Sequence, residues 1–192
     1  MDRKTRQMRC APTQFRAEED GGEKYIEGYF AVFGGIYELW PGATESIDPH
    51  AFDDTVGDDI RGLINHDTTL VLGRTKAGTL ELKLDSRGLW GRCKINQDDA
   101  DAMNLYARIK RGDIDQCSFG FDVLEEETDY RDDGSVHWTI KRVKLYEVSP
   151  VTFPAYEDTS VSARRRDYDQ ILRRMNAAWR TEMKGRLKKS GT

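Results

Sequence analysis

One serine in the sequence lies in an apolar run that suits a nucleophile. In Cys117-Ser118-Phe119-Gly120-Phe121-Asp122-Val123, the period-two alternation of a strand places the four apolar side chains on one face. Ser118 and Gly120 share the other face, where the missing side chain of Gly120 leaves room for a substrate backbone. The pattern favours Ser118 as a nucleophile. The alternative is that Ser118 is only a small residue on a half-buried strand.

A histidine that could serve as the base stands where an apolar strand pattern ends. His66 follows Leu63-Ile64-Asn65 and precedes Asp67. Strand ends and loops are where a rigid scaffold presents reactive groups, and an imidazole titrates near neutral pH. His66 could therefore take the proton of a serine hydroxyl. The alternative is a surface histidine in a turn, because its neighbours Asn65 and Asp67 are turn-forming residues.

A glutamate in a late apolar strand pattern completes the candidate set. By alternation, Glu147 shares a face with Val143, Leu145 and Val151. A carboxylate on an apolar face needs a hydrogen-bonding partner, and orienting a histidine is one such use. The alternative is a structural salt bridge to an arginine, and Ser149 on the same face could simply bond a nearby backbone group. The three residues would supply a base, a nucleophile and an orienting acid in the chain order His, Ser, Glu.

The elements that must position these residues are short strands and one helix. Strand patterns cover residues 25–33, 60–64, 69–74, 79–84, 88–95, 115–125 and 136–152, and Asp132-Asp133-Gly134 predicts a hairpin turn between the last two. A helix is expected between Asn96 as its N-cap and Gly112 as its stop, with Met103, Tyr106 and Ile109 as its buried stripe. This series of short strands separated by turns predicts an α+β fold, mainly an antiparallel β-sheet or barrel with a few helices.

Charge and composition divide the 192 residues into three predicted parts. Residues 1–23 are polar and are expected to form a flexible arm, and residues 24–162 form the body. Residues 163–192 contain ten basic and three acidic residues, a net charge of +7, which leaves −11 for the rest of the chain. Apolar residues at helical spacing from Tyr168 to Leu187 predict one basic amphipathic helix in this tail.

Several function classes are disfavoured by what the sequence lacks. The cysteines Cys10, Cys93 and Cys117 and the histidines His50, His66 and His137 are dispersed, so we expect no metal site and free thiols in a reducing cytoplasm. There is no glycine-rich phosphate loop, and no cofactor is expected. No apolar run is long enough to span a membrane, and no h-region of a secretory signal follows the first basic residues.

The motifs, taken in order, resemble the phage prohead protease family, whose members are similar to assemblin, the herpesvirus capsid assembly protease. The matching pieces are GYFAVF at 28–33, ESIDPHAF at 45–52, NHD at 65–67, LGR at 72–74, GL at 88–89, SFGF at 118–121 and EVSPVTFPA at 147–155. They span roughly residues 25–162. The resemblance implies a herpesvirus-protease-like fold for these residues, and the C-terminal amphipathic helix predicted above follows them.

The resemblance also implies a function and roles for residues. It implies a serine endopeptidase that cleaves scaffold segments and the major capsid protein inside the assembling procapsid in the host cytoplasm, acting as a homo-oligomer, expected to be a dimer. Ser118 would be the nucleophile and His66 the base. Glu147 would be the third member, where assemblin has a second histidine, with Asp67 as the fallback. His50 is interpreted as a loop residue.

Two other interpretations compete with the protease. An antiparallel barrel could equally assemble as a non-enzymatic capsid- or tail-tube-like virion protein. The basic tail could bind nucleic acid, although we do not expect it to. Our preferred interpretation of residues 163–192 is a docking helix that recruits the protein to a scaffold or capsid surface, and the alternative is a helix that packs on its own domain or on a second copy.

Overall fold

The computed structural model describes residues 7–11, 15–153, 168 and 173. The chain divides into two compact units, Met1–Tyr156 and Glu157–Thr192. All strands described below belong to the first unit. In the second unit only Tyr168 and Arg173 are described, and both are helical. The predicted tail helix otherwise lies outside the described residues and stays a prediction.

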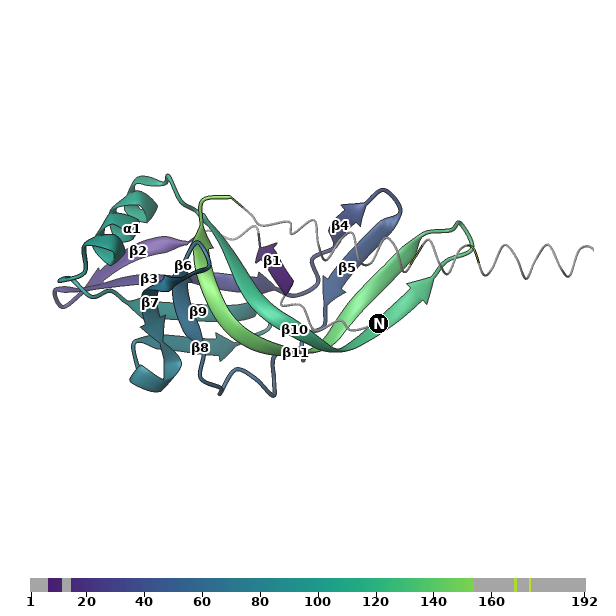
Figure 1. The fold of residues 1–192 in the computed structure, drawn as a ribbon, viewed down its shortest axis with the longest axis horizontal. Helices are drawn as coiled ribbons and strands as arrows, with labels where there is room; N and C mark the ends of the chain where they lie inside the picture. The colour runs from purple at the N-terminus through teal and green to yellow at the C-terminus, as the bar shows by residue number, and fades with distance from the viewer. Residues whose placement is uncertain (1–6, 12–14, 154–167, 169–172, 174–192) are drawn as a thin grey trace, which may run out of the picture. The chain divides into compact units, whose positions relative to one another are not determined.

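The smaller of two sheets contains four antiparallel strands at one end of the first unit (Figure 1). Its order is β2 (Arg16–Asp20), β3 (Glu23–Val32), β9 (Gly88–Lys94) and β8 (Leu80–Leu84). Gly21 and Gly22, with φ of 58° and 85°, form the turn between β2 and β3. Two consecutive positive φ angles are typical of tight hairpin turns, and glycine adopts them without steric strain.

The larger sheet contains seven strands and carries the candidate site. Its main path is β1 (Gln7–Ala11), β10 (Gln116–Tyr130), β11 (Val136–Val151), β5 (Ala43–Ile47) and β4 (Tyr37–Trp40). β6 (Arg61–Ile64) also pairs with β11, and β7 (Asp67–Arg74) pairs with β6; the short 3₁₀ helix Thr75–Ala77 follows β7. β5 and β6 run parallel to β11, and the other pairs are antiparallel.

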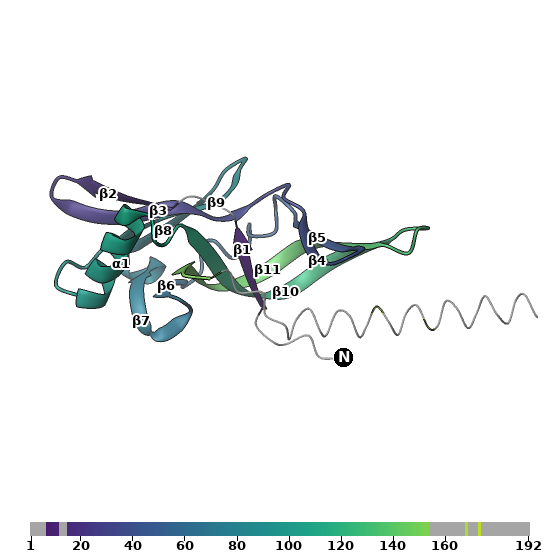
Figure 2. The ribbon, with the colours of Figure 1, turned by 90° about the horizontal axis from the view of Figure 1, so that it is seen from above.

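The long β10/β11 pair links the two ends of the sheet, as Figure 2 shows from above. β5 pairs with the first part of β11, up to Ile140, and β6 pairs with it again at Glu147 and Val148. Between these stretches the loop 48–55 takes the place of a strand. The Val143 amide donates to Ala51 O at 3.0 Å, and the Leu145 amide donates to Thr55 Oγ1 at 2.9 Å. These two amides, which have no described strand beside them on this edge of β11, thereby obtain hydrogen-bond acceptors.

The helix α1 (Ala100–Arg111) packs beside the small sheet. Its N-cap is Asp99 rather than the predicted Asn96, since the Asp99 side chain accepts from the amides of Asp101 and Ala102. Gly112, with φ of 88°, ends the helix as predicted. The buried stripe consists of Ala102, Leu105, Tyr106 and Ile109, while the predicted Met103 is only partly buried.

Aromatic side chains fill the core on one face of β10. Phe119 and Phe121 are fully buried and stacked with ring centroids 4.9 Å apart. Phe52, from the loop 48–55, meets Phe119 edge-on at 5.5 Å. The predicted apolar face of β10 is therefore confirmed, and its burial makes the strand a rigid platform.

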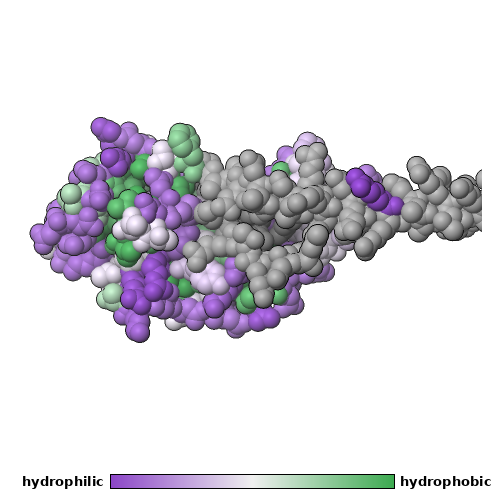
Figure 3. All heavy atoms as spheres, viewed as in Figure 1, coloured by the Kyte–Doolittle hydropathy of each residue, from purple (hydrophilic) through white to green (hydrophobic). Residues whose placement is uncertain are grey.

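The surface of the first unit is mostly hydrophilic in the view of Figure 3, where apolar side chains form small separate areas, the most extended of them at the end that carries α1. The large apolar side chains that are exposed are Ile36, Val71, Leu124, Tyr130 and Phe153. No helix in the described part of the chain is long and apolar enough to cross a membrane.

The structure corrects three expectations. The arm 1–23 is not flexible where it is described, because β1 pairs with β10 and β2 with β3; the polar side chains of β2, such as Arg16 paired with Glu27 at 2.7 Å, hid that strand from a hydrophobic pattern. The described strands form two sheets and no closed barrel, and β11 has parallel neighbours. One α-helix is described rather than a few, apart from the two helical residues of the second unit.

Candidate functional site

The β6–β7 hairpin turns at the two residues that present the histidine. Ile64 lies opposite Asp67, and the central residues Asn65 and His66 have φ of 51° and 61°. Positive φ at both central positions is the pattern of a type I′ turn. Asparagine and histidine adopt this conformation more often than most residues, but it still costs a non-glycine residue energy and persists only when the surroundings hold it.

Hydrogen bonds to the end of β11 hold this turn. The Asn65 amide donates to Pro150 O at 3.1 Å, and Asn65 Oδ1 accepts from the Thr152 amide at 2.8 Å. The His66 amide donates to Ser149 Oγ at 3.3 Å. The turn is therefore fixed against the strand that carries the candidate glutamate.

The His66 ring meets the Glu147 carboxylate in a short contact, with 2.7 Å between Nδ1 and Oε1. The side chains are 15% and 4% exposed, so both groups are largely withdrawn from water. The other carboxylate oxygen, Oε2, accepts from Ser149 Oγ at 2.6 Å. An ionised carboxylate only accepts, so it selects the tautomer with the proton on Nδ1 and leaves the lone pair on Nε2.

Glu147 reaches the site face because of a bulge that alternation did not predict. On β10, Gly120 lies opposite Glu147 and the next residue, Phe121, lies opposite Leu145, so Tyr146 is an extra residue in β11. The extra residue changes which side the chain faces. The expectation that Glu147 shares a face with Leu145 is therefore wrong: Leu145 faces the core with Phe121, and Glu147 faces the side of Ser118.

Ser118 lies on β10 directly opposite Ser149. Its hydroxyl is buried, and so is Nε2 of His66, and neither atom has a hydrogen-bond partner in the described part of the chain. The two atoms are thus not bonded to each other in this structure. Buried polar atoms without partners are rare, and serine–histidine contacts often tighten only when substrate is bound.

Access to Ser118 requires local movement, because the residue is fully buried. Strand β1 pairs with β10 beside it, and Cys10 lies opposite Ser118. A peptide can therefore reach the hydroxyl only if the groups packed around it move.

The other candidate residues lie apart from the His66–Glu147 pair. Asp67 Oδ1 accepts from the side chain and amide of Thr69, at 2.6 and 2.8 Å, and these hydrogen bonds lower the pKa of the Asp67 carboxyl. His50 is exposed in a loop, with Nδ1 2.9 Å from Asp53 Oδ2. Glu147, not Asp67, is therefore the carboxylate that contacts His66.

The cysteine beside the candidate nucleophile faces the other way. Cys117 is buried, and its Sγ lies 3.0 Å from the carbonyl of Tyr29. The other described thiol, Cys93, is buried too, and burial raises its pKa to about 12. The described residues contain no group of three or more histidine, cysteine or acidic side chains that could hold a metal ion.

Two members of the site were not predicted in their present roles. Ser149 contacts both His66 and Glu147, and Asn65 fixes the turn. The turn-forming character of Asn65 was visible in the sequence, but which strand the turn would contact was not. For Ser149 only a generic backbone bond was foreseen.

Fold and site together define a class: a mostly β protein that holds a histidine–glutamate pair on the same sheet face as a buried serine. The sequence model of the caudovirus prohead serine protease family matches residues 12–174, and the chain belongs to that family.

Two relatives found by sequence agree with this assignment. The chain is 26% identical over 155 residues to the prohead protease of Enterobacteria phage HK97, and 32% identical over 98 residues to that of Escherichia phage T5. The matches cover 79% and 51% of this chain but only 64% and 42% of those relatives. Among solved structures, the bacteriophage T4 capsid assembly protease matches with a TM-score of 0.42 and 13% identity, over 76% of this chain and 98% of that one.

Proposed function

We propose that this chain is a serine endopeptidase that cleaves scaffold segments and the major capsid protein inside the phage procapsid, in the host cytoplasm, during head maturation. Family membership supports the class of reaction. The single observation that carries the proposal is the 2.7 Å contact between His66 Nδ1 and Glu147 Oε1. A largely buried histidine with its second nitrogen unpartnered among the described residues is suited to act as a base.

In the proposed reaction, Ser118 Oγ attacks the scissile carbonyl carbon while His66 Nε2 takes the hydroxyl proton. Glu147 accepts the Nδ1 hydrogen bond and stabilises the imidazolium that forms. The imidazolium then gives its proton to the leaving amine, and the C–N bond breaks to leave an acyl-enzyme on Ser118. A water molecule, deprotonated by His66, hydrolyses the ester and restores the hydroxyl.

The decisive experiment coexpresses the protein with the capsid protein of the same phage and follows processing by gel and mass spectrometry. Ser118→Ala is expected to abolish processing. Ser135→Ala is the control, because Ser135 lies at the β10–β11 hairpin tip beside Asp133, away from the part of β11 that carries Glu147. Processing that persists in Ser118→Ala overturns the proposal that Ser118 is the nucleophile.

Narrower parts of the proposal concern assembly. We expect a herpesvirus-protease-like dimer, with residues 24–162 as the protease domain and residues 163–192 as a docking helix. Its +7 charge against −11 for the rest of the chain supports a separate role for the tail. Deleting residues 163–192 should reduce incorporation into procapsids while sparing cleavage of a peptide. Light scattering after size-exclusion chromatography tests the dimer.

A further inference from the structure

Ser149 contacts two of the three candidate catalytic residues and lies opposite the third. Its hydroxyl donates to Glu147 Oε2 at 2.6 Å and accepts from the His66 amide at 3.3 Å. It also lies directly opposite Ser118 across the β10/β11 pair. Ser149 has no exposed surface, so water does not compete for these two hydrogen bonds.

The contacts close a ring around the His66–Glu147 pair. The ring runs from the His66 amide through Ser149 Oγ to Glu147 Oε2, across the carboxylate to Oε1, and back through Nδ1 to His66. A carboxylate held at one oxygen alone can rotate about its last side-chain bond. Held at both oxygens, it keeps Oε1 aimed at Nδ1.

The same hydroxyl stabilises the strained backbone of the histidine. His66 has φ of 61°, a conformation that non-glycine residues leave unless neighbouring contacts fix it. The bond from the His66 amide to Ser149 is one such contact, and it comes from the strand that carries Glu147. The backbone of His66 is therefore held by Ser149 and its ring by Glu147, two residues of the same strand, β11.

We infer that Ser149 is a positioning residue that aligns His66 and Glu147 for proton transfer from Ser118. This inference rests on the proposed serine endopeptidase function. Ser149 is not assigned as the nucleophile, because its hydroxyl donates to Glu147 and accepts from the His66 amide, and it makes no hydrogen bond to a ring nitrogen of His66 in the described residues. It acts through the pair, so its loss should lower the chemical step and leave substrate binding intact.

The kinetic test compares Ser149→Ala with the parent protein on a peptide spanning a capsid-protein cleavage site. Ser149→Ala is expected to lower kcat by about 10–100-fold, the effect of a small misplacement of catalytic groups, with KM within about twofold. Thr55→Val is the matched control, since it also removes a buried hydroxyl that binds β11, at Leu145 on the other side of the bulge. Rates are measured where thermal melts show every variant folded, and Thr55→Val should keep kcat within about threefold.

A spectroscopic test separates this inference from the proposed function. In proton NMR, the Nδ1 proton of His66 in its short bond to Glu147 should give a far-downfield resonance, assigned by its absence in His66→Gln. Recorded in a Ser118→Ala background, the spectrum does not depend on proteolysis. Ser149→Ala should shift or broaden this resonance, and Thr55→Val should not.

The outcomes are distinct. A kcat within about threefold of the parent, or an unchanged His66 resonance in Ser149→Ala, overturns the positioning role. If Ser118→Ala still processes capsid protein, the proposed function fails, and the resonance still reports whether Ser149 aligns the pair. If Ser149→Ala does not fold, Ser149→Cys keeps nearly the same volume with a poor hydrogen-bonding group and is read in the same way.

Discussion

Gly120 lies directly opposite Glu147 across the β10/β11 pair, and the carboxylate occupies the space that any other side chain at position 120 would need. A methyl group built on Gly120 would overlap Glu147 Oε1 and lie 3.1 Å from Cδ. The sequence pattern predicted that Gly120 leaves room for a substrate backbone. In the structure, the Glu147 carboxylate of the same chain fills that room.

Gly120→Ala should accordingly displace the Glu147 carboxylate from His66. We expect kcat for peptide cleavage to fall by about 10²-fold, and the free energy of unfolding to fall by about 1–3 kcal/mol from overpacking. Gly57→Ala is the control, because a methyl group there meets open space. Equal activity of the two variants would show that Glu147 does not need this space.

Glu147→Gln tests the charge of the carboxylate while keeping its shape. The amide cannot stabilise the imidazolium, and in a serine protease triad the matching change of the acid to its amide lowers kcat by about 10⁴-fold. We expect a fall of at least about 10²-fold in steady-state cleavage of a peptide. Asp67→Asn should stay near full activity, because Asp67 bonds Thr69 rather than His66. The reverse order would restore Asp67 as the acid.

The strands and the core face of the site could be predicted because they leave local patterns. Seven expected strands exist with shifted ends, and the apolar face of β10 around Phe119 is buried as alternation required. His66 does lie where an apolar strand ends. Each of these signals depends only on neighbours in the chain, so a single sequence contains it.

The remaining features depend on partners far along the chain. The bulge at Tyr146 is defined by register against β10, and only that register shows that Glu147 faces Ser118. β2 is rich in charged side chains that pair across its hairpin, so it has no apolar period to detect. The ring through Ser149 joins residues 83 positions apart. The spacing of residues along the sequence does not reveal contacts between such distant positions.

The loop that replaces a strand along β11 should make stability depend on pH at acid values. Asp48 Oδ2 accepts from Lys141 Nζ at 2.6 Å and Oδ1 from the His50 amide at 2.9 Å, and these bonds lower the pKa of Asp48 below its ordinary value of 3.8. The folded state therefore binds this proton less readily than the unfolded state. The stabilisation is present above about pH 4 and is lost as pH falls toward the lowered pKa.

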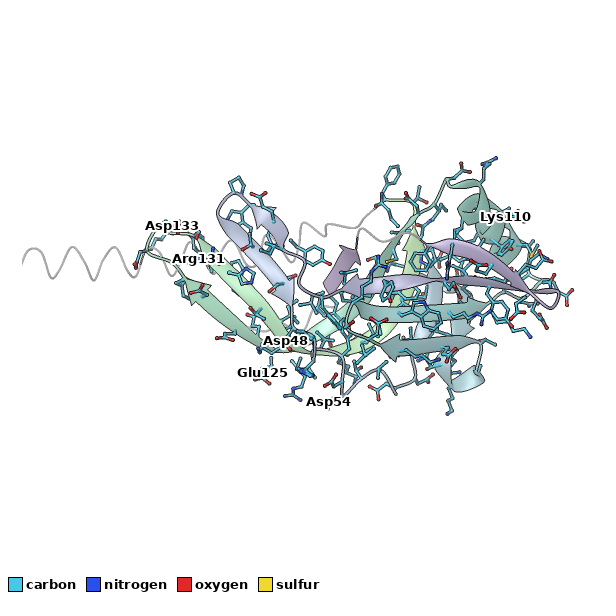
Figure 4. All side chains as sticks on the ribbon, turned by 180° about the vertical axis from the view of Figure 1, so that it is seen from behind. Asp48, Asp54, Lys110, Glu125, Arg131 and Asp133 are labelled. Carbon is cyan, nitrogen blue, oxygen red and sulfur yellow. The ribbon has the colours of Figure 1, made fainter. Side chains whose placement is uncertain are left out.

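Asp48→Asn should reduce the free energy of unfolding by about 1 kcal/mol at pH 7, a small value because Lys141 is partly exposed and solvent screens the pair. The difference from the parent should shrink at pH 2–3 in urea denaturation. Asp54→Asn, an exposed position of the same loop near Asp48 in Figure 4, is the control. A difference that stays constant from pH 7 to pH 2 would contradict the assigned ion pair.

Cys117 stands next to the proposed nucleophile, so a thiol mechanism must be tested against the serine. Its buried Sγ contacts the carbonyl of Tyr29 on the core side of β10. Cys117→Ala should keep most of the peptide-cleaving activity and lose about 1 kcal/mol of stability through a small cavity. Alkylation of the native protein followed by peptide mapping should leave Cys117 and Cys93 unmodified, because burial excludes the reagent and raises the pKa of Cys93 to about 12. Loss of cleavage in folded Cys117→Ala, together with its retention in Ser118→Ala, would assign the chemistry to the thiol instead.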